Sequence, residues 1–260
     1  MHDTNKFYLS NSMLTDWNSM CPVEWKERWI DKNPAYELDS IAIQLGNAFE
    51  QNVIGMSVGG KVTEPSPELK KNASYPRMLE QAKRCRRYLK DLGGKIIGRQ
   101  TYLFSEVQDV NGNTIYICGN LDILYEMPDG HRIIIDLKFT GDTENTWGDF
   151  AWGKPESMNL SQSIQYSLLH KCVYPQLPTP EFIYSVWDHK PAMRFLPLRV
   201  KISDQAFDDH IENLSMAYFE ITDSMMFDTW TPTPSFDKCS QCKVPCKYQV
   251  KYPEVKEIYI

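Results

Sequence analysis

The chain of 260 residues contains no apolar run that approaches the roughly 20 residues needed to cross a bilayer, so we expect no membrane-spanning helix. Its first residues, MHDTNKFYLSNSM, lack a basic region followed by an apolar one. We therefore expect no secretory signal and a cytoplasmic location. Repeats and low-complexity tracts are also missing. With 42% hydrophobic and 24% charged residues, the composition is that of a globular protein rather than a disordered one.

Positive charge is in short supply as well, since the formal net charge is −6, whereas a protein that binds phosphates usually carries a basic surplus. The segment 68–100 is an exception, with ten Lys or Arg residues against three acidic ones. Within it, residues 74–92 predict an amphipathic helix. Five basic residues project from its polar face: Arg77, Lys83, Arg84, Arg87 and Lys90. Such a run is usually a solvated face, and the alternative is a track for the phosphates of DNA.

The hydrophobic pattern predicts helices and strands in an order typical of an α/β fold, with helices packed on a mixed central sheet. Helices are expected over 10–32, 41–55, 74–92, 157–173 and 203–226, and a loop around Pro65 and Pro67. Strands are expected over 95–107, 114–127, 131–139, 181–187 and 193–201. We expect three segments: an N-terminal helical segment (1–40), a core (41–228) and a C-terminal tail (229–260).

Two neighbouring strands end in charged residues that a buried strand does not ordinarily carry. RIIIDLKFTG (132–141) runs from three isoleucines into Asp136 and Lys138, which the period of two places on one face. GNLDILYE brings Asp122 onto the preceding strand. Converging carboxylates repel unless a cation sits between them, and oxygen ligands select Mg²⁺ or Mn²⁺. An Asp-x-Lys sequence is common, and by itself it favours a solvated ion pair at a strand tip.

Four short motifs, taken in order, resemble those of the RecB-type nucleases of the PD-(D/E)XK superfamily. They are LGNAFE (Gly46, Glu50), GNLD (Gly119, Asp122), DLK (Asp136, Lys138) and QSIQY (Gln162, Tyr166). Gln162 and Tyr166 are four residues apart, so they share one face of a helix. Glu50 stands where many relatives carry His, and its alternative is a surface Glu on an amphipathic helix.

The resemblance implies a PD-(D/E)XK (restriction-endonuclease-like) core and a metal-dependent deoxyribonuclease. Glu50, Asp122 and Asp136 would bind Mg²⁺ or Mn²⁺, Lys138 would serve the attacking water, and Gln162 and Tyr166 would support the site and the DNA end. It further implies 5′-phosphate products and an exonuclease that acts on DNA ends or single strands. Two alternatives stay open: a non-catalytic nucleic-acid-binding or interaction protein on the same fold, and a zinc-stabilised endonuclease.

The chain has seven cysteines, an odd number, and no secretory signal, and both features argue against a framework of disulfide bonds. Cys239, Cys242 and Cys246 fall within eight residues, and Cys21 is the natural fourth ligand for a four-thiolate site. One Cys before a nuclease core and three after it resembles the iron–sulfur-containing CRISPR-associated adaptation exonucleases, which implies a four-iron four-sulfur cluster. Because the last gap is three residues where those relatives have five, Zn²⁺ is the alternative.

Overall fold

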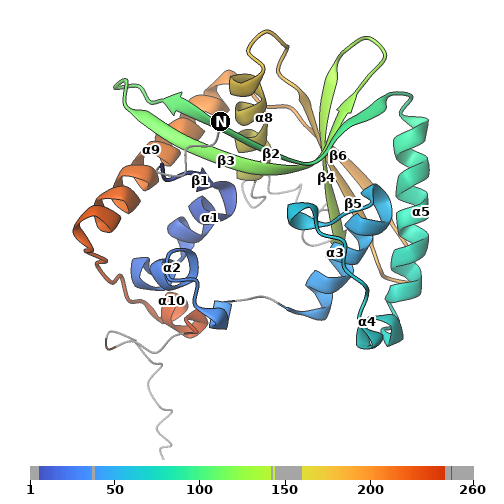
Figure 1. Cartoon of the computed structure of the whole chain (residues 1–260), viewed down its shortest axis with the longest axis horizontal. Coiled ribbons are helices and arrows are strands. Elements are labelled where there is room, and N and C mark those ends of the chain that lie inside the picture. The colour runs from blue at the N-terminus through green and yellow to red at the C-terminus, as the bar shows by residue number, and fades with distance from the viewer. Residues whose placement is uncertain (1–5, 37–38, 142, 144–159, 244–246, 248–260) are drawn as a thin grey trace, which may run out of the picture. The chain divides into compact units, whose positions relative to one another are not determined.

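The protein is described here from a computed structural model (Figure 1), which covers residues 6–36, 39–141, 143, 160–243 and 247. The chain forms two compact units. The first comprises Met1–Tyr8 and Asp39–Glu212, and the second comprises Leu9–Leu38 and Asn213–Ile260. Among the described residues, no helix combines the length and the apolar composition required to cross a membrane.

The first unit is built on a mixed sheet in the order β2-β3-β4-β5-β6. Its strands are β2 (Lys95–Gln108), β3 (Thr114–Glu126), β4 (Arg132–Thr140), β5 (Glu181–Asp188) and β6 (Phe195–Val200). All neighbours are antiparallel except β4 and β5, which are parallel and lie on either side of α8 (Ser161–Val173) in the chain. The predicted mixed α/β architecture is therefore confirmed. Of the helix predicted over 157–173, residues 157–159 lie outside the described residues.

Two helices, α3 (Ile41–Ile54) and α5 (Tyr75–Asp91), cover one face of this sheet. Their apolar side chains form one buried cluster with alternate residues of β3, β4 and β5, among them Ile123, Ile135 and Leu137. The residues between these, such as Asp136 and Lys138, point to the opposite face, where α8 lies (Figure 1). The period of two thus divides β4 into a core-facing set and a set that faces α8.

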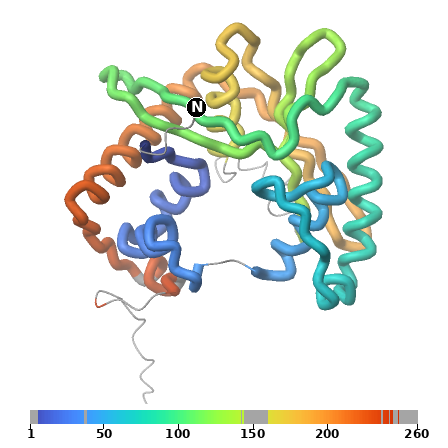
Figure 2. Tube along the Cα trace, in the orientation of Figure 1, coloured from blue at the N-terminus to red at the C-terminus, as the bar shows by residue number. Residues whose placement is uncertain are grey.

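The connection between α3 and α5 corrects one expectation from the sequence. Residues around Pro65 and Pro67 were expected to form a loop, yet Pro67–Lys71 form the short helix α4. Proline is compatible with the first helical position because its missing N–H has no partner there, and the Ser66 hydroxyl accepts the backbone N–H of Leu69 at 3.1 Å. The 3₁₀ turn η2 (Val58–Gly60) precedes it, and the tube in Figure 2 follows this path from α3 to α5.

The second unit is helical and contains α1 (Asn11–Ser19), α2 (Pro22–Trp29), the 3₁₀ turn η1 (Pro34–Tyr36) and α10 (Phe236–Gln241). The short strand β1 (Leu9–Ser10) precedes α1, and α9 (Asp204–Phe227) begins in the first unit and ends in the second. The continuous helix expected over 10–32 is wrong. Met20 and Cys21 are extended (ψ 166° and 138°), and for Cys21 the reason is that a residue before a proline avoids the helical region.

Three tryptophans form an aromatic cluster in the second unit. The ring of Trp25 is fully buried, lies 5.3 Å from that of Trp17 in an edge-on arrangement, and stacks on Trp230 at 6.0 Å. Aromatic pairs contribute about 0.5–1.5 kcal/mol beyond the burial of their area. The cluster joins the N-terminal helices to the segment that leads to Cys239, although these are more than 200 residues apart in the chain.

Two buried histidines of the first unit predict a loss of stability in mild acid. Burial, together with the charge of Arg132, lowers the pKa of His170 to about 4, and burial lowers the pKa of His210 to about 4. Between pH values of about 6.5 and 4 the unfolded chain binds protons that the folded chain does not, so the free energy of unfolding falls as the pH falls.

We expect urea titrations to show this effect as a difference between the wild-type protein and His170→Gln. For one such group the contribution amounts to about 2 kcal/mol between about pH 7.5 and about pH 5. The variant, which has no imidazole to protonate, should lose that much less stability over the same range. Parallel curves for the two proteins would show that His170 is not buried in its neutral form.

Candidate active site

The candidate site lies where β3 and β4 separate. The two strands pair from Glu126 opposite Arg132 as far as Ile123 opposite Ile135. One further step would set Asp122 opposite Asp136, but the backbone N–H of Leu137 donates instead to Asp122 Oδ2 at 2.8 Å. A side-chain carboxylate has thus taken the place of the next strand-to-strand hydrogen bond, and the fork brings two acidic residues together.

On the face toward α8, three side chains form a closed hydrogen-bonded ring. Lys138 Nζ lies 2.7 Å from Asp136 Oδ2 and donates to Gln162 Oε1 at 3.1 Å. Gln162 Nε2 in turn donates to Asp136 Oδ1 at 2.9 Å. The amide of Gln162 therefore fixes both members of the ion pair, and the structure brings together the Asp, Lys and Gln that the sequence motifs singled out.

Glu50 reaches the same site from α3, through a residue that the motifs did not indicate. Gln100 Nε2 on β2 donates to Glu50 Oε1 at 3.2 Å and to Asp122 Oδ1 at 3.1 Å. The Oε1 atom of Gln100 accepts a hydrogen bond from the side-chain amide of Asn120. Sequence reasoning missed Gln100 and Asn120. The available signal was the register across the Asn111–Asn113 turn, which sets Gln100 opposite Asp122.

The electrostatics of the site are dominated by buried carboxyl groups. Glu50, Asp122 and Asp136 are 7%, 9% and 1% exposed, and burial raises the pKa of each. For Asp122 the charges of Asp136 and Glu50 add to burial, and its pKa lies well above the usual range. Burial opposes the charged form of Lys138, but the carboxylates of Asp136 and Asp122 outweigh it and raise its pKa. Lys138 is the one described cation within ion-pair distance of these acids.

The ring of Tyr166 packs closely against Gly119 on β3. A Cβ atom at position 119 would lie 2.7 Å from Cε1 of Tyr166, closer than real contacts of this kind, so the ring needs a glycine on β3. Burial, with the nearby charge of Asp136, raises the pKa of the Tyr166 hydroxyl, which also bonds to Gln162. The two residues predicted to share one face of α8 do so.

The donor set at the fork suits Mg²⁺ or Mn²⁺, which prefer carboxylate oxygens. In this conformation, however, no three Asp, Glu, His or Cys side chains of the described residues are grouped closely enough to hold a metal ion. The Gln100 amide connects Glu50 to Asp122, and Lys138 covers one oxygen of Asp136. The chemistry of the three carboxylates fits a divalent cation, and their present hydrogen bonds engage some of the oxygens that would ligate it but leave the buried Glu50 Oε2 without a donor among the described residues.

The basic residues of α5 do not contact the carboxylates. Of the five predicted DNA-binding residues, two arginines donate to main-chain carbonyls, Arg77 to His189 at 3.1 Å and Arg84 to Met193 at 2.6 Å, and Lys83 pairs with Glu80 at 3.5 Å. Arg87 and Lys90 are exposed. The helix packs on the face of the sheet opposite α8. A role of these five residues in DNA binding stays a prediction.

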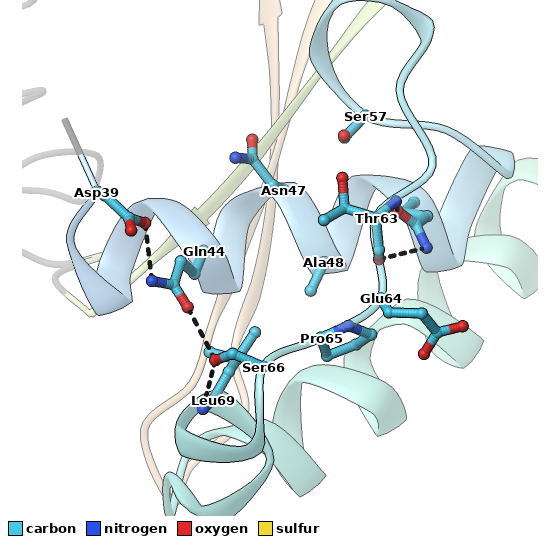
Figure 3. A pocket seen from close by; sticks show the side chains of 11 residues that line it. Asp39, Gln44, Asn47, Ala48, Ser57, Thr63, Glu64, Pro65, Ser66 and Leu69 are labelled. Carbon is cyan, nitrogen blue, oxygen red and sulfur yellow. Dashed lines mark hydrogen bonds between the residues drawn. The ribbon is translucent and has the colours of Figure 1, made fainter. Parts of the chain in front are cut away.

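A separate pocket of about 300 Å³ lies beside α3 (Figure 3). Its lining residues are Asp39, Gln44, Asn47, Ala48, Gln51, Ser57, Thr63, Glu64, Pro65, Ser66 and Leu69. The polar groups are largely bonded to one another, as between Gln44 and Asp39 at 2.7 Å. With two acids and no basic side chain in its lining, the pocket does not suit a phosphate, and we assign it no role.

Three of the four predicted cysteine ligands are described, all in the second unit. Cys21 precedes α2, Cys239 lies in α10 and Cys242 follows α10, and none of these three forms a disulfide with another described residue. Cys246 lies outside the described residues. The backbone N–H of Thr233 lies 3.4 Å from Cys21 Sγ, and Lys238 Nζ donates to the carbonyl of Met20 at 3.2 Å. The neighbours of Cys21 and Cys239 in the chain are therefore in contact. The identity of any centre here stays a prediction.

No protein-family model matches this chain, and no curated protein matches it. Among solved structures it is similar to a crystal structure from Eubacterium rectale described as a "Putative exonuclease", with a TM-score of 0.59 and 16% identity over 98% of this chain and 92% of that one. It also matches the crystal structure of SSO0001, with a TM-score of 0.42 and 12% identity over 96% and 90% of the two chains. The likeness to the Eubacterium rectale protein shows that the chain has the same mixed α/β fold, with a central sheet flanked by helices.

Proposed function

We propose that this protein is a metal-dependent deoxyribonuclease on a PD-(D/E)XK core of the RecB type, which hydrolyses DNA phosphodiester bonds. The observation that supports this most strongly is an imbalance of charge. Glu50, Asp122 and Asp136 are buried together at the fork of β3 and β4, and Lys138 is the one described cation paired with them. A buried charge that no partner offsets is costly, so the group calls for a divalent cation.

Each residue has a place in this proposal. Glu50, Asp122 and Asp136 would hold Mg²⁺ or Mn²⁺, which when bound would polarise the phosphate and acidify the attacking water. Lys138 stays protonated because its pKa is raised, so it suits stabilisation of the charge that develops on the phosphate and orientation of the water. Gln162 holds Lys138 in position, and Tyr166 supports Gln162 from the next turn of α8.

The similarity in fold is consistent with this function but is too distant to carry it alone. The Eubacterium rectale structure is described as a "Putative exonuclease", and the likeness extends over nearly the whole of both chains. A nuclease implies a nucleic acid as the binding partner. For this chain we propose a preference for DNA ends or single strands.

The proposal is tested by digesting end-labelled linear and circular DNA, each single- and double-stranded, with Mg²⁺, Mn²⁺ or EDTA. We expect linear substrates to be degraded from an end when metal is present, and EDTA to stop the reaction. If circular DNA is degraded as fast as linear DNA, the protein is an endonuclease rather than an exonuclease. Binding of DNA without cleavage under any metal would contradict the enzyme and favour the non-catalytic alternative on this fold.

For the second unit, we propose that Cys21, Cys239, Cys242 and Cys246 bind one centre, a four-iron four-sulfur cluster, with Zn²⁺ as the alternative. The support is the contact of Thr233 with Cys21 and of Lys238 with Met20, which draws the chain around Cys21 toward α10. Four thiolates meet the coordination that both centres require.

A further inference from the structure

Gln100 stands at the centre of the site without belonging to any motif of the sequence. Its Nε2 atom donates to one carboxylate on each side, Glu50 Oε1 at 3.2 Å and Asp122 Oδ1 at 3.1 Å. Both protons of the amide are thereby used on these two carboxyl groups, which also lie close enough to interact directly with each other. The Asn120 amide donates to Gln100 Oε1, which turns the NH₂ group toward the acids. The amide connects the two carboxylates from within hydrogen-bond distance of both.

The backbone at Gln100 supports a role for the side chain. Its φ is +44°, in the left-handed region, which a residue other than glycine or asparagine occupies at a cost of roughly 1 kcal/mol or more. The residues on either side of Gln100 remain paired with β3, Arg99 opposite Ile123 and Thr101 opposite Leu121. A glycine would relieve the backbone but would bring no amide to the acids. The cost of the strained backbone conformation is therefore offset by the hydrogen bonds that the long amide side chain of Gln100 makes to the acids.

We infer that the side-chain amide of Gln100 is a placeholder for the divalent cation: it holds Glu50 and Asp122 together in the metal-free site and gives up these hydrogen bonds when the cation binds. The inference rests on the proposed function, since it assumes that these carboxylates bind a metal. It explains why the acids are buried together although no three of the described candidate ligands surround one point in this conformation. Gln100 is thus a positioning residue rather than a catalytic one.

The consequence is a difference between the metal-free and metal-bound states. Without metal, Gln100 offsets the repulsion and desolvation of two buried acids, so its loss weakens that state. With metal, the cation makes the same connection more strongly, so the loss of Gln100 matters little. A residue with a merely structural role would stabilise both states equally. Removal of the amide should therefore lower the stability of the metal-free protein and tighten metal binding.

The test compares Gln100→Met with Gln165→Met by thermal unfolding and calorimetric titration of Mn²⁺ into EDTA-treated, dialysed protein. Gln165 on α8 is a matched control, because its buried amide donates to the main-chain carbonyl of Cys118 on β3 at 3.0 Å. In the metal-free state we expect Gln100→Met to lower the melting temperature by about 4 °C, as for two lost hydrogen bonds. The Gln100→Met variant should also bind Mn²⁺ more tightly, with a dissociation constant about fivefold lower than that of the wild-type protein. Gln165→Met should leave the dissociation constant unchanged.

A second variant sharpens the experiment. Gln100→Glu has the same shape but replaces the donor by a fourth carboxylate, so the metal-free protein should melt below Gln100→Met and should bind Mn²⁺ more tightly still. Wild-type affinity in both variants, or weaker binding in Gln100→Met, would overturn the placeholder while leaving the metal site in place. If the wild-type protein itself bound no Mn²⁺, the proposed function would fail together with the inference.

Discussion

Replacing Asp136 by Asn should abolish metal-dependent cleavage while leaving the fold intact. The change keeps the shape of the side chain and removes one charge from a site that needs it to hold a cation. It also takes the counter-charge from Lys138, whose Nζ lies 2.7 Å from Asp136 Oδ2. Because burial raises the pKa of Asp136, its neutral replacement should not lower the melting temperature of the metal-free protein by more than a few degrees.

The companion change, Lys138→Met, should reduce the rate of cleavage by about 10²–10³-fold, as on removal of one group that stabilises developing charge. It should leave Mn²⁺ binding measurable, since the carboxylates remain. The measurements are single-turnover cleavage of end-labelled DNA and calorimetric titration of Mn²⁺.

A suitable control for both changes is Asp188→Asn. Asp188 on β5 is as buried as Asp136, at 1% exposed, but it accepts from Thr143 and from the Arg194 backbone, away from the fork. This variant should keep cleavage once folded. Near wild-type cleavage by folded Asp136→Asn protein would show that the reaction does not take place at this fork.

Much of the site was predictable because it follows from local rules. The period of two places Asp136 and Lys138 on one face of β4, and the spacing of four places Gln162 and Tyr166 on one face of α8. A tight turn between β3 and β4 then makes Asp122 a neighbour of Asp136. These relations need only positions in the sequence and the geometry of single elements, and the structure brings these residues together.

Other features depend on pairings that the sequence does not fix. Gln100 lies opposite Asp122 in the register that the hairpin sets, but the positive φ at Gln100 and the bulge farther along β2, between Ile96 and Gly98, are local irregularities. Neither is visible in the hydrophobic pattern. The polar face of α5 illustrates the same limit. Periodicity shows that Arg77 and Arg84 leave the core, but not that they meet the carbonyls of His189 and Met193.

The second large effect is expected for Cys21→Ser, which should remove the proposed centre of the second unit and much of that unit's stability. A structural metal site contributes about 10–16 kcal/mol of apparent binding free energy, and where the site forms only in the folded chain that energy is folding energy. Cys21 is half-buried at the start of α2, where the Thr233 backbone approaches its sulfur at 3.4 Å. Serine supplies no thiolate, so three ligands would be left.

Anaerobically purified wild-type, Cys21→Ser and Cys172→Ser proteins decide the matter by iron, sulfide and zinc analysis, visible absorption and thermal unfolding. Cys172 on α8 is a matched control, because it is half-buried like Cys21 but lies in the first unit. We expect it to keep the centre, and Cys21→Ser to lose both the centre and the unfolding transition of the second unit. A colourless wild-type protein with one zinc would overturn the iron–sulfur assignment and keep the four ligands. A full complement of metal in Cys21→Ser would overturn the ligand set, because a four-coordinate thiolate centre does not survive intact when one of its four sulfurs is removed.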